Sequence, residues 1–214
     1  MRAVIFANGE LGQPERMRAL LRADDYLIAA DGGLRHLRAL DRKPDLLIGD
    51  LDSVSQPDVD WLAGGSTEIR KFPAEKDFTD LELALRAAHE RGVEGILLAA
   101  ALGGRLDQTL ANIGLLRLPE LSGMDVSLDD GLTEVRLITA TLTIQGSEGD
   151  IVSLIPAGSA VEGVRTHALQ YPLNAETLSP GQTRGISNVM LTDQAAVEIE
   201  HGELLCVHLR KNNL

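Results

Sequence analysis

The hydrophobic pattern of the chain changes its period near the middle, and this change constrains the fold more than any other feature. Up to about residue 121, short apolar runs alternate with segments of helical period, and beyond it short strand-like runs are separated by turn residues. The first pattern predicts an open, mainly parallel α/β sheet, and the second predicts an all-β sandwich or barrel. The 214 residues are enough for both. We therefore predict an α/β domain at 1–137 and a β-sandwich domain at 138–214.

The expected elements follow from these two periods. In the first half we predict strands at 4–7, 26–30, 46–48, 67–72 and 96–102, and helices at 15–22, 34–40, 81–89 and 108–116. In the second half we predict strands at 126–128, 134–138, 142–144, 151–155, 161–164, 196–199 and 204–209. The strands at 126–128 and 134–138 could belong to either domain, so the boundary is the least defined part of this prediction.

The charge balance and the single cysteine exclude several classes of protein. Thirty-two acidic and 20 basic residues give a net charge of −12, which repels nucleic-acid backbones and anionic membranes. One cysteine, Cys206, allows neither an intrachain disulfide nor a cysteine-based zinc site. No apolar run reaches the ~20 residues of a membrane span, and the run near the N-terminus is too short for a signal peptide. We expect a cytoplasmic protein that binds small molecules, with no nucleic acid or membrane as partner.

Acidic residues follow two of the predicted parallel strands. Asp31-Gly32-Gly33 follows the second strand, and Asp50-Leu51-Asp52 follows the third. Ligands bind to open α/β sheets at the carboxyl ends of the strands. Alternate residues of an extended segment point the same way, so Asp50 and Asp52 could face one cation, and carboxylate oxygens suit Mg²⁺. By itself the Asp-x-Asp pattern also fits an ordinary turn.

A second acidic pair lies at the start of the helix predicted at 81–89. Thr79 and Glu82 fit a capping box, although Asp77 could instead be the N-cap with Asp80 three residues later. Both aspartates would then lie near a helix N-terminus, where the macrodipole favours negative charge. Capping alone could explain them, but it does not explain the adjacent Lys76.

A glycine-rich turn links the last apolar strand of this half to a helix. In Gly103-Gly104-Arg105, the paired glycines let the backbone approach a ligand closely, and the following helix N-terminus can bind an anion. The arginine adds a donor fork suited to phosphate. The turn matches neither the Walker A loop nor Gly-x-Gly-x-x-Gly. Carboxylates for a metal, with lysine and arginine for phosphate, are the components of a phosphoryl-transfer site.

Taken in order, these motifs resemble the thiamine pyrophosphokinase family. The resemblance continues through Tyr171-Pro172-Leu173 and Gly185-Ile186-Ser187-Asn188, and so spans nearly the whole chain. It implies an α/β catalytic domain, a thiamine-binding β-sandwich domain, and a homodimer with thiamine held where domains and subunits meet. It also implies Mg²⁺ as the metal and ATP as cosubstrate. The thiamine hydroxyl would attack the β-phosphorus of ATP in line, giving thiamine diphosphate and AMP.

The same resemblance assigns roles to individual residues. Four aspartates would form the metal site, Asp50, Asp52, Asp77 and Asp80, and these four would be catalytic together with Arg105 and Asp107. Asp107 or Asp80 could accept the hydroxyl proton. Substrate contacts would come from Asp31, Gly32, Gly33, Lys76, Thr79, Gly103, Gly104, Gln108, Asn112, Ser187 and Asn188. Among these, Ser187 and Asn188 would hold the thiamine aminopyrimidine, although without the resemblance they indicate only a polar turn.

One position departs from the family pattern. Gln108 stands where the family usually has histidine, and glutamine cannot titrate near neutrality. We interpret it as a tuning change, because Arg105 and Asp107 are retained. The alternatives are a diphosphokinase for another alcohol such as a hydroxymethylpterin, a phosphohydrolase with Asp50-Leu51-Asp52-Ser53-Val54 as nucleophile motif, and a non-catalytic thiamine or nucleotide sensor.

Overall fold

The chain forms two compact units in a computed structural model that describes residues 1–211. The first unit is Met1–Gly131, and the second begins at Leu132. This division falls a few residues before the predicted boundary, because β7 (Thr133–Ile138) pairs along its whole length with β14 (Leu204–Leu209) of the second unit. The strand predicted at 126–128, which the sequence could not assign to either domain, pairs in parallel with a strand of the first unit.

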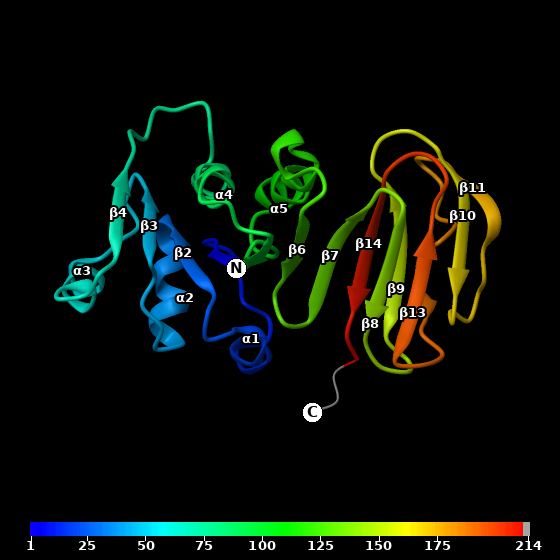
Figure 1. The fold of residues 1–214 in the computed structure, drawn as a ribbon, viewed down its shortest axis with the longest axis horizontal. Helices are drawn as coiled ribbons and strands as arrows, with labels where there is room; N and C mark the ends of the chain where they lie inside the picture. Colours follow the sequence, from blue (N-terminus) through cyan, green and yellow to red (C-terminus); the bar gives the residue numbers. More distant parts are fainter. Residues whose placement is uncertain (212–214) are drawn as a thin grey trace. The chain divides into compact units, whose positions relative to one another are not determined.

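The first unit contains a parallel sheet with the strand order β6-β5-β1-β2-β3-β4 (Figure 1). Every pairing within it is parallel, which confirms the predicted α/β class. The strands are β1 (Arg2–Phe6), β2 (Tyr26–Ala30), β3 (Leu46–Gly49), β4 (Glu68–Lys71), β5 (Gly95–Ala99) and β6 (Asp125–Asp129), and the helices are α1 (Pro14–Leu20), α2 (Leu34–Ala39), α3 (Gln56–Leu62), α4 (Asp80–Glu90) and α5 (Leu106–Gly114). Short 3₁₀ turns complete the unit at η1 (Asp31–Gly33), η2 (Leu115–Arg117) and η3 (Pro119–Leu121).

The central strands are buried on both faces, as their continuous apolar runs predict. Val4 and Phe6 of β1 share a core with Met17 of α1, Leu37 of α2 and Leu62 of α3. Helix α4 packs against β1, β2 and β3 through its own buried face, which includes Leu81 and Leu85. Helix α3 was not predicted from the sequence, although its start is marked by a Ser55–Asp58 capping box with proline in the first turn.

The second unit is a β-sandwich, as predicted. One group of strands has the order β12-β9-β14-β7, and the other has the order β11-β10-β13-β8 (Figure 1). Their inner faces share one core, to which Leu154 and Cys206 contribute from the first group and Val164 and Val197 from the second. The remaining strands are β8 (Thr141–Gln145), β9 (Ile151–Pro156), β10 (Val161–His167), β11 (Asn174–Leu178), β12 (Asn188–Val189) and β13 (Gln194–Glu198). Strands β11 and β12 were not predicted from the sequence, because β11 is mostly polar and β12 has only two residues.

The single cysteine lies in the core of the second unit. Cys206 is buried, and burial raises the pKa of its thiol to about 12, so the side chain is an unreactive part of the core at neutral pH. Among residues 1–211, no helix combines the length and the apolar character needed to cross a membrane.

Candidate active site

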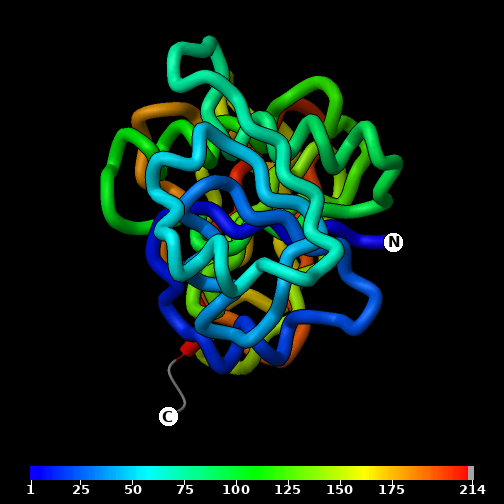
Figure 2. The backbone as a smooth tube through the Cα atoms, turned by 90° about the vertical axis from the view of Figure 1, so that its left-hand side faces the viewer, coloured from blue at the N-terminus to red at the C-terminus, as the bar shows by residue number. Residues whose placement is uncertain are grey.

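A cleft opens at the carboxyl ends of the parallel strands, where the direction of strand addition reverses. The chain adds β2, β3 and β4 on one side of β1 and places β5 and β6 on the other. Ligands bind at such switch points because the loops leaving the two neighbouring strands diverge there. The cleft has a volume of about 580 Å³ and is lined by residues that follow β1, β2, β3 and β5 and by the segment between β4 and α4. That segment rises beyond the strand ends (Figures 1 and 2).

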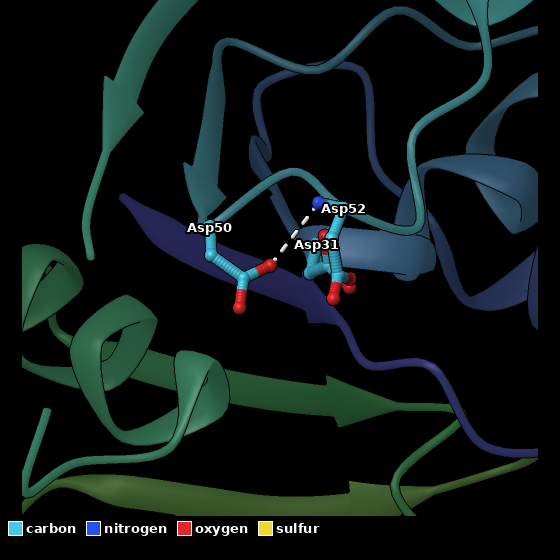
Figure 3. Close-up of side chains that lie close together, drawn as sticks. All are labelled: Asp31, Asp50 and Asp52. Carbon is cyan, nitrogen blue, oxygen red and sulfur yellow. Dashed lines mark hydrogen bonds between the residues drawn. The ribbon is translucent and has the colours of Figure 1, made fainter. Parts of the chain in front are cut away.

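Three carboxylates converge at the strand ends beside this cleft. Carboxylate oxygens of Asp31, Asp50 and Asp52 all lie within 4.8 Å of one another (Figure 3). Asp50 Oδ1 accepts a hydrogen bond of 3.1 Å from the backbone N–H of Asp52, which fixes the turn after β3. The structure therefore brings together two of the four predicted metal ligands and adds Asp31, which the sequence analysis assigned to substrate binding.

The donor set of this group fits a hard divalent cation. Asp31 is 8% exposed, and its Oδ1 is buried without a hydrogen-bond donor among the described residues. A buried carboxylate oxygen without a partner is costly unless a ligand satisfies it. Oxygen ligands from two or more carboxylates, with room beside them for phosphate, are the environment that Mg²⁺ prefers.

The backbone is strained at three of the strand ends that surround the cleft. Asp31, Leu51 and Ala100 have φ values of +45°, +65° and +51°, and they follow β2, β3 and β5. Leucine and alanine rarely adopt this region, and such residues persist only where the surrounding structure holds them. Their concentration at one edge of the sheet supports a functional role for that edge.

Asp80 lies close to the three-carboxylate group and is paired with Lys76. Its Oδ1 is 2.7 Å from Lys76 Nζ. Burial raises the pKa of Asp80; Lys76 opposes this rise, while the charges of Asp31 and Asp50 add to it. Asp80 is therefore a more basic carboxylate than an exposed aspartate.

The start of α4 resolves the two capping alternatives. Thr79 is the N-cap, and its hydroxyl oxygen accepts a hydrogen bond from the Glu82 backbone N–H. The Glu82 carboxylate bonds to Arg86 instead of completing a capping box. Asp77 is exposed, and it belongs neither to the three-carboxylate group nor to the cleft lining, although Lys76, Thr79 and Asp80 all line the cleft.

The turn after β5 contributes glycines and cations to the cleft, as its sequence suggested. Gly103 and Gly104 have φ values of +77° and +67°, which only glycine adopts freely. The exposed Arg105 forms an ion pair with Asp107, whose pKa is held below its ordinary value chiefly by this hydrogen bonding. Gln108 is one of the residues that line the cleft, and Asp107 is not.

Asn112 lines the cleft from inside α5. Its Nδ2 donates a hydrogen bond of 2.8 Å to the Ala101 carbonyl, and the residue is buried. This contact ties α5 to the turn that follows β5. Asn112 therefore helps to fix the position of the glycine-rich turn.

The two glycines of Asp31-Gly32-Gly33 lie where a larger side chain would clash with neighbouring atoms. A Cβ at Gly33 would lie 1.9 Å from the Phe6 carbonyl oxygen, and one at Gly32 would lie 2.5 Å from the Asn8 side chain. Gly33 itself has an ordinary helical conformation with φ −58°. The start of α2 is thus pressed against the end of β1, which holds Asp31 beside the other carboxylates.

The loop after β1 is a part of the cleft that the sequence analysis did not assign. Asn8, Gly9 and Glu10 line it, and Arg35 of α2 donates to the carbonyl oxygens of Asn8 and Gly9 at 2.9 and 2.7 Å. The rule that selected Asp31 and Asp50 could have found this loop, since it directly follows the first predicted strand. Nothing in the sequence indicates the role of Arg35.

In the second unit, Ser187 and Asn188 lie at the start of β12. The Asn188 side chain is buried and engaged with the backbone, since Oδ1 accepts from the N–H groups of Tyr171 and Val189 and Nδ2 donates to the Tyr171 carbonyl. Ser187 is exposed, has φ +57°, and donates its backbone N–H to Ser153 Oγ. Asn188 thus shapes a turn that presents Ser187.

Comparison with known proteins gives two family matches that follow the division into units. Residues 17–128 match the family described as "Thiamin pyrophosphokinase, catalytic domain", and residues 139–206 match "Thiamin pyrophosphokinase, vitamin B1 binding domain". The chain is 30% identical to thiamine pyrophosphokinase 1 of Arabidopsis thaliana, over 80% of this chain and 68% of that protein. It is 27% identical to thiamine pyrophosphokinase of Bacillus subtilis, over 74% and 75% of the two chains.

A solved structure supports the fold independently. The crystal structure of thiamine pyrophosphokinase from Bacillus subtilis superposes with a TM-score of 0.88 at 24% identity and covers 99% of this chain and 100% of that chain. The order of the two units is therefore that of known structures with this fold.

Proposed function

Because the chain belongs to the thiamin pyrophosphokinase family, we propose that it transfers a diphosphate from ATP to thiamine in the cleft of the first unit. The observation that carries this assignment to the site is the convergence of Asp31, Asp50 and Asp52 beside a glycine-arginine turn. Family membership argues against the hydroxymethylpterin enzyme and the phosphohydrolase. It also argues against a sensor without activity, because the family is one of enzymes.

The cleft offers separate environments for the metal and for the phosphates. Asp31, Asp50 and Asp52 would hold Mg²⁺, which when bound would neutralise charge on the transferred phosphates. Asp77 and Asp80, the other predicted ligands, lie outside this group, and Asp77 also lies outside the cleft lining. The N–H groups at the start of α5 and the Arg105 guanidinium would bind phosphate oxygens.

In the proposed reaction the thiamine hydroxyl oxygen bonds to the β-phosphorus of ATP as the bond from that phosphorus to the α,β-bridging oxygen breaks. AMP leaves with the bridging oxygen, and the hydroxyl proton passes to a carboxylate. Asp80 suits this role better than Asp107, since Asp80 lines the cleft and has a raised pKa, whereas Arg105 lowers the pKa of Asp107.

Thiamine recognition is assigned to the second unit, as in the family description of residues 139–206. Ser187 is the residue we propose to contact thiamine directly, because it is exposed, whereas the buried Asn188 amide is hydrogen-bonded to the backbone of Tyr171 and Val189. The acidic first unit also suits a substrate whose thiazolium ring is positively charged.

The test is the release of AMP from ATP and Mg²⁺, measured with and without thiamine, together with the appearance of thiamine diphosphate. We expect AMP and thiamine diphosphate in equal amounts only when thiamine is present. AMP or free phosphate formed at the same rate without thiamine would contradict the proposed reaction.

We further propose that the protein is a homodimer, with an apolar face of the second unit at the interface. Ile151, Ile155 and Leu209 are 38–40% exposed on neighbouring strands, where Ile151 pairs with Leu209. Exposed apolar side chains grouped in this way favour protein contact. The cytoplasmic location predicted from the sequence stays a prediction.

Sedimentation equilibrium should therefore give twice the chain mass of 23.0 kDa. Ile155→Lys should shift the population to monomer, because a charge in an apolar interface is costly. Val59→Lys also replaces an exposed apolar side chain by lysine, at a 45% exposed position of α3, and should leave the dimer intact. A wild-type protein that sediments at the mass of one chain at micromolar concentration would refute the dimer.

A further inference from the structure

Lys76 is placed inside the acidic pocket rather than on the outer surface. Its side chain is 13% exposed, and its ammonium group lies 2.7 Å from Asp80 Oδ1. Asp80 in turn converges with Asp31, since a Cβ at Gly49 would lie 3.0 Å from Asp31 Cβ and 3.2 Å from the Asp80 carboxyl carbon. The ammonium thus offsets part of the negative charge that four neighbouring carboxylates concentrate there.

The Lys76 ammonium is the partner of Asp80 Oδ1 in this pocket. Asp31 Oδ1, by contrast, is buried and has no hydrogen-bond donor among residues 1–211. The Asp31 oxygen is therefore available to a ligand, and the Asp80 oxygen becomes available when Lys76 leaves it. Because Lys76 belongs to the segment before α4 and not to the sheet, its side chain can leave Asp80 without disturbing the strand ends.

A divalent cation among Asp31, Asp50 and Asp52 would place positive charge close to this ammonium. Two positive charges that lie close together repel strongly in a partly buried site, where water screens them poorly. If ATP enters with the cation, its phosphates give the ammonium a new partner, and the repulsion is removed. If the cation enters alone, the repulsion remains.

We propose that Lys76 is an internal counter-ion that couples the two ligands: it opposes binding of a free divalent cation and favours binding of the cation together with ATP. This inference rests on the proposed function, in which the carboxylates bind the metal and the cleft binds ATP. It assigns to Lys76 the task of making metal and nucleotide enter as a pair.

The experiment measures two equilibria on the intact protein. Free Mn²⁺ binding is followed by electron paramagnetic resonance without nucleotide, and binding of α,β-methylene ATP with Mg²⁺ is followed by calorimetry. We expect Lys76→Met to bind free Mn²⁺ about tenfold more tightly, because a repelling charge is gone, and to bind the magnesium–analogue complex about tenfold more weakly, because a phosphate contact is lost. Lys76→Gln should behave like Lys76→Met, and Lys76→Arg should behave like the wild type.

The controls separate this inference from the proposed function. Lys71→Met removes the same charge from an exposed position outside the cleft lining and should change neither equilibrium. The double variant Asp50→Asn/Asp52→Asn should lose Mn²⁺ binding. If it does, and Lys76→Met and Lys76→Gln bind free Mn²⁺ no more tightly than the wild type, the counter-ion role is overturned and the metal site stands. If the double variant binds Mn²⁺ like the wild type, the metal site itself is refuted, and the inference falls with it.

Discussion

Asp50→Asn is expected to lower kcat/KM for thiamine-dependent AMP release by roughly a thousandfold, which corresponds to about 4 kcal/mol of transition-state stabilisation. Asp50 belongs to the three-carboxylate group and lies in the turn after β3. Its Oδ1 accepts a hydrogen bond from the Asp52 backbone N–H. The amide keeps the shape of the side chain but removes one negative charge and one anionic oxygen. We therefore expect the fold to survive and the metal-dependent chemistry to be lost.

The matched control for this variant is Asp24→Asn. Asp24 is exposed and precedes β2, at the amino end of the sheet, whereas Asp50 follows β3 at the carboxyl end. The same change of charge there should leave kcat/KM within about twofold, as is usual for surface substitutions away from a site. AMP release by Asp50→Asn at a rate within a few-fold of the wild type would contradict the assigned role of the carboxylate group.

Gly33→Ala is expected to lower the free energy of unfolding of the first unit by about 3 kcal/mol. The added Cβ would lie 1.9 Å from the Phe6 carbonyl oxygen, and a backbone atom inside a buried strand cannot rotate away as a side chain does. Either α2 or the end of β1 must shift. Because Asp31 immediately precedes these glycines, we also expect the variant to lose activity.

Urea unfolding followed by tryptophan fluorescence measures this effect in the correct unit. Trp61 is the single tryptophan, and it packs against the core of the first unit from α3. A loss of about 3 kcal/mol should lower the urea midpoint by about 1–3 M. Gly114→Ala is the matched control, since nothing lies within 4 Å of a Cβ there, and alanine near the end of a helix should raise stability by up to about 1 kcal/mol. Equal midpoints for Gly33→Ala and the wild type would show that the clash is relieved at little cost.

The sequence by itself determined the fold class and placed the candidate site residues of the first unit at one edge of the sheet. A strand with a continuous apolar run, such as 96–102, needs cover on both faces, and the alternating helices supply that cover. Because parallel strands end at the same edge, Asp31, Asp50 and the Gly103-Gly104 turn had to lie near one another. The direction of the strands decides this proximity, and the positions of the side chains do not enter into it.

Only the tertiary structure decided which carboxylates form one group and which stand apart. Asp77 and Asp80 are equally acidic and three residues apart in the sequence, yet the start of α4 at Asp80 turns one into solvent and the other toward Asp31. The need for Gly33 arises from the Phe6 carbonyl, 27 positions earlier in the chain. Contacts of this kind depend on the packing of a helix onto a strand. Local pattern carries no information on them, because burial and close approach are properties of segments that meet only after folding.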